Sequence, residues 1–122
     1  WSDLLPASTT KEYARILGII NNRKIFDKNT YEILSELLET VMKNPANQTW
    51  LTHAGMKGGS TLFVLTKAMY ATLKNGTRIE FAYFFNDLTQ QQNQQLQSWM
   101  NDFELKIISD KNFRKEVANS FN

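Results

Sequence analysis

Asn75-Gly76, set between two largely apolar stretches, is the feature that most restricts how this chain can fold. A two-residue type I′ turn needs positive φ at both central positions, which Asn and Gly adopt more readily than other residues. The dipeptide therefore predicts a β-hairpin, with strands over residues 62–73 and 77–86. A two-residue loop would place Lys74 opposite Thr77.

This loop also fixes which residues of the two strands pair. Tyr70 is expected opposite Phe81, and Ala68 opposite Tyr83. One face of the hairpin would carry Val64, Ala68, Tyr70, Ile79, Phe81 and Tyr83, and the other Leu65, Met69, Leu73, Ala82 and Phe84. Because both faces are mostly apolar, we expect helices to cover the sheet on two sides.

A glycine-rich stretch at residues 53–61 precedes the hairpin. It reads His53-Ala54-Gly55-Met56-Lys57-Gly58-Gly59-Ser60-Thr61 and holds three of the five glycines and the one histidine. Glycine permits close approach of another group to the backbone. We interpret residues 50–60 as a first strand whose edge receives a ligand. The alternative interpretation is a glycine-rich turn before a strand.

Helix signals flank the predicted strands. Thr9 followed by Glu12 is a capping-box pattern, and an apolar stripe then leads to Asn21-Asn22. Asp27 is a predicted N-cap for a second helix, which should stop at Asn44-Pro45 because the residue before proline avoids helical angles. The apolar stripes of these two helices are Tyr13, Ile16, Leu17 and Ile20, then Ile33, Leu34, Leu37, Leu38 and Val41.

A long helix is predicted after the strands, because Thr89 and Gln92 repeat the capping-box pattern. Its apolar stripe consists of Leu96, Trp99, Met100, Phe103 and Ile107, which we interpret as core positions. Residues from Asp110 onward either extend this helix or form a second one. The order helix-helix-strand-strand-strand-helix predicts an α+β fold with a three-stranded antiparallel sheet, in a single domain over residues 1–122.

Composition excludes several classes of function. The net charge is +2 with no run of Lys or Arg, so no nucleic-acid partner is expected. Cysteine is absent, and one histidine with scattered carboxylates makes no metal-ligand pattern, so neither metal nor cofactor is expected. His53 is interpreted as a structural histidine. The apolar runs are too short to span a membrane, and no signal peptide is visible.

Several segments together resemble the C-terminal part of serine β-lactamases and penicillin-binding D-alanyl-D-alanine peptidases. Residues 8–17 are similar to the helix after the family's omega loop, and residues 22–26 to the link to the next helix. Lys57-Gly58-Gly59-Ser60 resembles the Lys-Thr-Gly motif. Asn75-Gly76 with residues 79–85 resembles the hairpin that follows, and residues 96–108 the closing helix.

The resemblance implies acyl transfer, in which a serine attacks an amide or β-lactam carbonyl and an ester intermediate forms. Lys57 would attract the substrate carboxylate, and the Ser60 backbone N–H would be one oxyanion donor. Substrate binding would involve Lys57, Gly58, Gly59, Ser60 and Thr61. Gly58 departs from the family, which has Thr or Ser there. The family's Ser-x-x-Lys nucleophile and Ser-x-Asn loop lie in the other half of the fold.

Ser8 and Lys11 offer another interpretation, because they also form a Ser-x-x-Lys pattern. Only 45 residues separate Lys11 from Lys57, too few for the helical subdomain that the family places between these motifs. No Ser-x-Asn or Tyr-x-Asn lies in that interval. A capping box at the start of an ordinary helix accounts for the same residues.

Three hypotheses therefore stand. The first is a C-terminal, incomplete piece of a bacterial β-lactamase or D,D-peptidase, extracytoplasmic and inactive alone. Its partners would be the missing N-terminal half or a second copy of the chain, and its ligand a β-lactam or peptidoglycan peptide. The second is a self-sufficient, non-catalytic binding or structural module. The third is a minimal enzyme that uses Ser8 and Lys11.

Overall fold

A computed structural model describes residues 7–121 and has an α+β architecture. Four helical segments come first: α1 (Thr10–Asn22), α2 (Lys28–Leu38), the 3₁₀ helix η2 (Thr40–Lys43) and α3 (Pro45–Gln48). The strands β1 (Leu51–Ser60), β2 (Leu65–Leu73) and β3 (Arg78–Phe85) follow, and α4 (Gln90–Ser109) and α5 (Lys111–Ser120) end the chain. The predicted order is confirmed, with α5 as a separate second helix.

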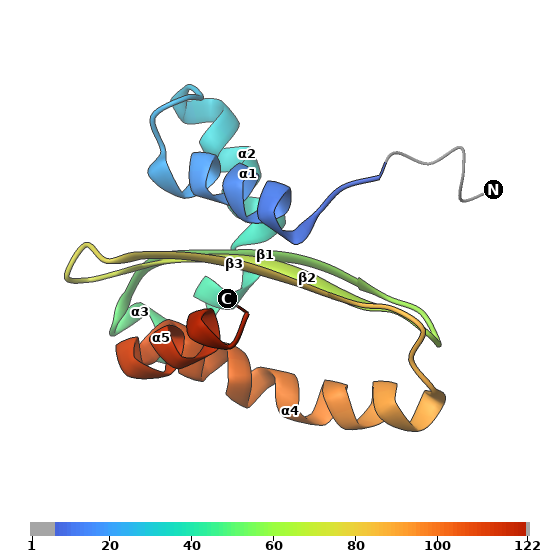
Figure 1. Cartoon of the computed structure of the whole chain (residues 1–122). Helices are drawn as coiled ribbons and strands as arrows, with labels where there is room; N and C mark the ends of the chain where they lie inside the picture. Colours follow the sequence, from blue (N-terminus) through green and yellow to red (C-terminus); the bar gives the residue numbers. More distant parts are fainter. Residues whose placement is uncertain (1–6, 122) are drawn as a thin grey trace.

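The three strands form an antiparallel sheet in the order β1-β2-β3, with a helical layer on each face (Figure 1). On the face that α1 covers, here called the α1 face, Leu17 packs with Ala68 and Tyr70. The opposite face, here called the α4 face, packs against α4 and α5. Its core consists of Leu51, Ala54, Met69, Ala71, Ile79, Ile107 and Ile108. Cover on both sides, expected from the two apolar strand faces, is confirmed.

Local capping chemistry sets the helix starts as predicted. The Glu12 N–H donates to Thr9 Oγ1 at 3.2 Å, and the Thr9 N–H donates to Glu12 Oε2 at 2.8 Å. Thr89 and Gln92 form the second capping box. Asp27 accepts from the Thr30 N–H at 2.9 Å. Each side chain satisfies an amide that the helix itself leaves unpaired.

The predicted end of the second helix is wrong by about a turn and a half. Helix α2 stops at Leu38, and the chain continues as η2 and α3. Asn44 accepts the Ala46 N–H at 3.0 Å and so caps α3, with Pro45 in its first turn. Proline has no N–H to lose there, which is why Asn44-Pro45 starts a short helix here.

The predicted hairpin loop exists, but its register differs by one residue. Leu73 donates its N–H to Thr77 O, and Gly76 donates to Leu73 O, both at 2.9 Å, so the loop has three residues, 74–76. Gly76 has φ 83, whereas Asn75 is not among the described residues with positive φ. This geometry is a turn followed by a glycine bulge instead of a type I′ turn.

The pairs expected from a two-residue loop are therefore wrong. Tyr70 pairs with Glu80, and Ala68 pairs with Ala82. Because a shift of one residue exchanges the faces of a strand, the β3 side chains expected on each face lie on the other. Ile79, Phe81 and Tyr83 share a face with Met69, and Ala82 and Phe84 share a face with Ala68 and Tyr70.

Two further expectations about the apolar residues fail. Strand β2 begins at Leu65, since Thr61 N–H bonds to Val64 O at 2.9 Å and residues 61–64 turn between the strands. Trp99 is 62% exposed and is not core. The buried stripe of α4 is therefore narrower than its apolar pattern, and β3 is the last strand on that side of the sheet within residues 7–121.

Candidate functional site

Strand β1 lies at one edge of the sheet, and β2 is its one strand neighbour among residues 7–121. Its first half is covered, because α2, η2 and α3 pack against it and Ala54 is 1% exposed. Its second half, residues 57–60, is exposed. We call this second half the open end of β1. The sequence prediction of a strand at residues 50–60 with an accessible glycine-rich edge agrees with this placement.

Backbone groups at the open end of β1 point alternately to β2 and to the open side. The Thr61 N–H donates to Val64 O, toward β2. Backbone groups of successive residues in an antiparallel strand face opposite sides. Those of Gly59 therefore face β2, and those of Gly58 and Ser60 face the open side. The Ser60 N–H, the predicted oxyanion donor, is thus directed out of the sheet.

The three glycines of β1 have different physical explanations. A Cβ at Gly55 would lie 2.5 Å from the Tyr70 ring, so the absent side chain makes room for that ring. Tyr70 is 1% exposed, and its hydroxyl donates to Glu39 Oε1 at 2.8 Å. Gly55 is therefore required by packing within the protein, and it gives no evidence of a ligand.

Gly58 and Gly59, at the open end, differ in how much space the protein leaves for a side chain. A Cβ at Gly58 would lie 2.8 Å from Thr66 O and 3.3 Å from Lys67 Cγ. At Gly59 the nearest atom would be Thr66 Oγ1, at 3.8 Å, an ordinary contact distance. Gly59 is thus the one glycine of the three that the protein's own packing does not require.

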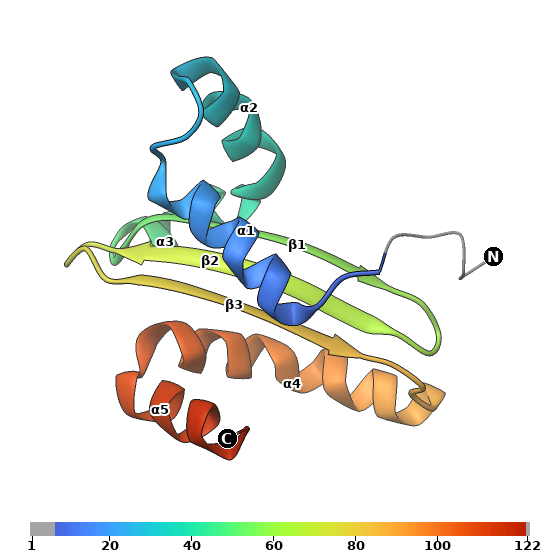
Figure 2. The ribbon, with the colours of Figure 1, turned by 45° about the horizontal axis from the view of Figure 1, so that its top comes forward.

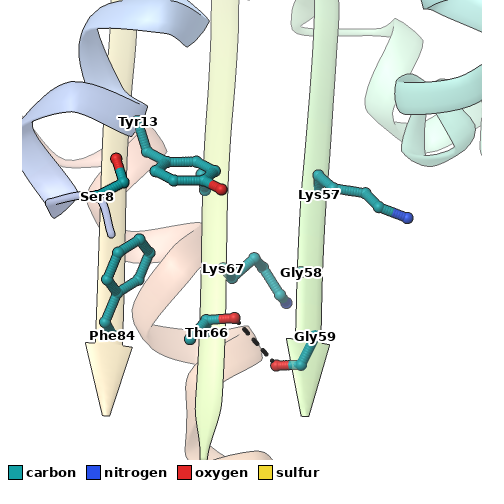
Figure 3. A pocket seen from close by; sticks show the side chains of 9 residues that line it. Ser8, Tyr13, Lys57, Gly58, Gly59, Thr66, Lys67 and Phe84 are labelled. Atoms are coloured by element: carbon teal, nitrogen blue, oxygen red, sulfur yellow. Dashed lines mark hydrogen bonds between the residues drawn. The ribbon is translucent and has the colours of Figure 1, made fainter. Parts of the chain in front are cut away.

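A shallow groove of about 410 Å³ runs across the sheet from this open end (Figure 3). Its floor includes Gly59 and Thr66, whose hydroxyl donates to Gly59 O at 3.2 Å. Tyr13 and Phe84 form an aromatic wall, with ring centroids 5.4 Å apart in an edge-to-face arrangement. Figure 3 shows Lys57 extending from β1 away from β2. The groove thus offers polar backbone and an aromatic surface, and the Lys57 side chain stands at its open end and points outward.

Ser8 lines the same groove, whereas Lys11, the other residue of the Ser-x-x-Lys pattern, is not among the residues that line it. Helix α1 begins at Thr10, after Ser8, and the Ser8 hydroxyl donates to Glu12 Oε2 at 3.0 Å. In Figure 3, Ser8 lies near β3 and Lys57 on β1, with β2 between them. The structure brings these two predicted site residues into one groove without bringing their side chains together.

The sequence interpretation did not single out Lys67, which borders the groove from β2. Its side chain lies on the opposite, α4 face of the sheet and pairs there with Glu104 of α4, with 2.7 Å between Nζ and Oε1. The Tyr83 hydroxyl donates to the same carboxylate oxygen at 2.5 Å. Burial and this hydrogen bond raise the pKa of Tyr83. The sequence signal would have been the register between β1 and β2, which sets Lys67 opposite Gly58.

His53 lies on the covered half of β1 and has a structural role, as the sequence indicated. Its Nε2 is 2.8 Å from Asn21 Oδ1, which also accepts from Thr72 at 2.7 Å. Burial lowers the pKa of His53, and the charge of Arg23 lowers it further. The imidazole therefore lies in a polar cluster that disfavours its protonated form, away from the groove.

The described part of the chain contains no group of three His, Asp or Glu residues that could hold a metal ion. No helix in residues 7–121 is long and apolar enough to cross a membrane. Comparison with protein-family models, curated proteins and solved structures gave no match to this chain.

Proposed function

We propose that this chain supplies the substrate-binding strand of a β-lactamase-like serine hydrolase, whose nucleophile lies on polypeptide outside residues 7–121. The observation that carries the proposal is the open end of β1. Lys57 is exposed there, and the Ser60 N–H is directed to the open side of an edge strand. An acyl substrate could pair with the strand at this edge, with a cation beside it.

The proposed chemistry is acyl transfer to a serine. The serine oxygen attacks the carbonyl of a β-lactam or a D-alanyl-D-alanine amide, the C–N bond breaks, and the nitrogen receives the proton that the serine loses. The amine departs from the peptide as D-alanine, whereas in the β-lactam it stays attached in the opened ring. Negative charge builds up on the carbonyl oxygen only in the transition state, so the Ser60 N–H lowers the barrier selectively. Lys57 attracts the substrate carboxylate, and Gly59 leaves room for the substrate against the strand. Such an enzyme would act outside the cytoplasm of a bacterium.

Labelling with a fluorescent penicillin tests the proposal on the full-length gene product that contains this chain. Lys57→Ala should slow labelling about 10- to 100-fold, since a charge-assisted hydrogen bond is lost. Lys74→Ala is the matched control, because Lys74 is an exposed lysine in the β2–β3 loop, and it should leave the rate unchanged. Equal rates for the Lys57 variant and the control would contradict the proposal.

Penicillin labelling of the 122-residue chain alone distinguishes an incomplete hydrolase from a minimal enzyme. An incomplete hydrolase should show no labelling, whereas labelling that Ser8→Ala abolishes would establish a minimal enzyme. The open edge of β1 also favours a second candidate, a non-catalytic module that adds an extended peptide as a fourth strand. That module would bind peptide in this chain alone, and the full-length product would show no acyl transfer.

A further inference from the structure

Asn93 is buried, although it lies near the start of α4 among side chains that are exposed. It is 4% exposed, whereas residues 90–92 and 94 are all exposed. Its Nδ2 donates to Thr61 O at 2.7 Å and to Leu62 O at 3.1 Å, and its Oδ1 accepts from Gln97 Nε2 at 2.6 Å. Both N–H groups of this amide are therefore used, and both are directed at the turn that follows β1.

The turn at residues 61–64 is held in place largely through Thr61. The Thr61 N–H donates to Val64 O at 2.9 Å, and Thr61 Oγ1 accepts from the Phe63 N–H at 3.3 Å. The remaining polar group of Thr61, its backbone oxygen, is the one that Asn93 binds. The backbone of Thr61 therefore cannot rotate in either direction without breaking a hydrogen bond.

Ser60 lies between this fixed residue and the last paired glycine of β1. It pairs with Leu65 across the two strands, and on its other side Gly59 O accepts from Thr66 Oγ1 at 3.2 Å. A residue has only two soft backbone dihedrals, so fixing both of its neighbours also fixes the direction of its N–H. The hydrogen bonds between Asn93 and the turn thus help to aim the Ser60 N–H.

We propose that Asn93 is a positioning residue, which holds the Ser60 N–H in the direction in which it donates to the oxyanion. This inference rests on the proposed function of the open end of β1. Asn93 acts through Thr61 and does not touch the substrate. An oxyanion donor is effective because it is aimed before the reaction, so that nothing has to reorganise when negative charge develops. Loss of this aim lowers the rate of acylation and leaves binding of the unreacted substrate almost unchanged.

Acylation of the full-length gene product by a fluorescent penicillin, measured over a range of concentrations, separates rate from binding. Asn93→Leu and Asn93→Asp both remove the two N–H donors and nearly keep the size of the side chain. In both variants we expect the limiting acylation rate to fall about 10- to 100-fold, the cost of a misplaced catalytic group. The penicillin concentration that gives half of this rate should change by less than about twofold.

Asn47→Leu and Asn47→Asp are the matched controls. Asn47 also donates its amide N–H to a backbone oxygen, that of Val41, at 2.8 Å. It lies in α3, which packs against β1 away from the open end. These variants should leave both the limiting rate and the half-saturating concentration unchanged, so they separate loss of one side-chain hydrogen bond in general from loss of the bonds that hold Thr61.

Hydrogen exchange in the 122-residue chain tests the same hydrogen bonds without any acyl transfer. The Thr61 amide should exchange about tenfold faster or more in Asn93→Asp, because the turn opens more often when its oxygens lose their donors. Amides in the middle of β2 and β3 should keep their exchange rates. Unchanged exchange at Thr61 would overturn the inference whatever the acylation rates are.

An unchanged limiting rate in a folded Asn93 variant would also overturn the inference. A higher half-saturating concentration at an unchanged limiting rate would do the same, since it would describe a lost binding contact. An equal fall in the Asn47 controls would show a general effect of destabilisation and would contradict positioning. Failure of the unmodified protein to react with penicillin is a different result, because it would remove the proposed function itself and with it the role of Asn93.

Discussion

The two edges of the sheet differ in chemistry although they belong to the same three strands. The open end of β1 consists of Lys57, Gly58, Gly59 and Ser60, which are small or charged and exposed. The β3 edge borders an apolar groove of about 580 Å³ between the sheet, α4 and α5, and Figure 2 shows these helices beside β3. Its lining includes Phe81, Tyr83, Phe85, Leu96, Trp99, Phe103 and Phe121.

This difference indicates two kinds of contact. A polar edge can bind and release a ligand, because water replaces the ligand at little cost. An aromatic edge gains most when it is covered permanently by other polypeptide. We therefore expect other polypeptide to contact the β3 edge, either a second copy of the chain or the further half that the proposed function requires. The four predictions that follow test this assignment, from the largest effect to the smallest.

The largest effect should come from glycine substitutions in β1, measured by urea unfolding. Gly55→Ala forces a Cβ to within 2.5 Å of the buried Tyr70 ring, and moving that ring breaks its hydrogen bond to Glu39. We expect a loss of about 2–4 kcal/mol in the free energy of unfolding. Gly59→Ala is the matched control and should change stability by less than about 1 kcal/mol. Similar losses for both variants would remove the distinction between the covered and open halves of β1.

A bulky residue at Gly59 should affect the ligand more than the fold. Gly59→Leu places a side chain in the groove near Thr66, where the protein leaves space. Penicillin labelling of the full-length product should fall about 10- to 100-fold, the cost of an overpacked contact. The midpoint of thermal unfolding, measured in parallel, should stay nearly constant. Full labelling by this variant would mean that the substrate does not lie against Gly59.

Removal of Trp99 tests the aromatic edge. Trp99 is 62% exposed, so Trp99→Ser should cost the monomer less than about 1 kcal/mol. Self-association of the 122-residue chain should weaken about tenfold or more, because aromatic anchors dominate protein interfaces. Sedimentation or light scattering at high concentration measures this, with Lys57→Ser as the variant that leaves association unchanged. A wild-type chain that stays monomeric at high concentration would contradict pairing between copies.

The smallest effect concerns His53 on the covered half of β1. Its pKa is lowered in the folded state, chiefly by burial, so the unfolded chain takes up a proton first as the pH falls. The free energy of unfolding should therefore be constant above about pH 6.5 and decline below it. His53→Gln, which keeps a donor for Asn21, should remove that decline. Urea titrations from pH 8 to pH 5 measure it, and an unchanged slope in the variant would contradict the assignment.

Features controlled by neighbouring residues could be predicted from the sequence. The caps at Thr9, Asp27 and Thr89 depend on side chains within three residues of the helix start, and all three were correct. The hairpin register was not, because it depends on whether Asn75 adopts positive φ, and both loop types accept Asn-Gly. That one error also assigned the β3 side chains to the wrong faces.

In the candidate site, too, features set by nearby residues could be predicted from the sequence, and contacts between distant residues could not. The edge position of Lys57 followed from the strand order, whereas the ion pair between Lys67 and Glu104 joins residues 37 positions apart. Trp99 was misassigned because the helical period shows which residues share a stripe but not how wide the covering sheet is. Contacts between a strand and a helix that are far apart in the sequence can be identified only from the three-dimensional arrangement of the sheet and its helices.

The hydrogen bonds of the Asn21 side chain restrict how helix α1 can move relative to the sheet. Its amide donates to Ala71 O and Glu80 Oε1, and its carbonyl oxygen accepts from Thr72 and lies beside His53 Nε2. The last turn of α1 is therefore tied to all three strands at one point. Sliding of α1 along the sheet would break these bonds together, so the distance between the Tyr13 wall and β1 can change only by pivoting of the helix about its C-terminal end.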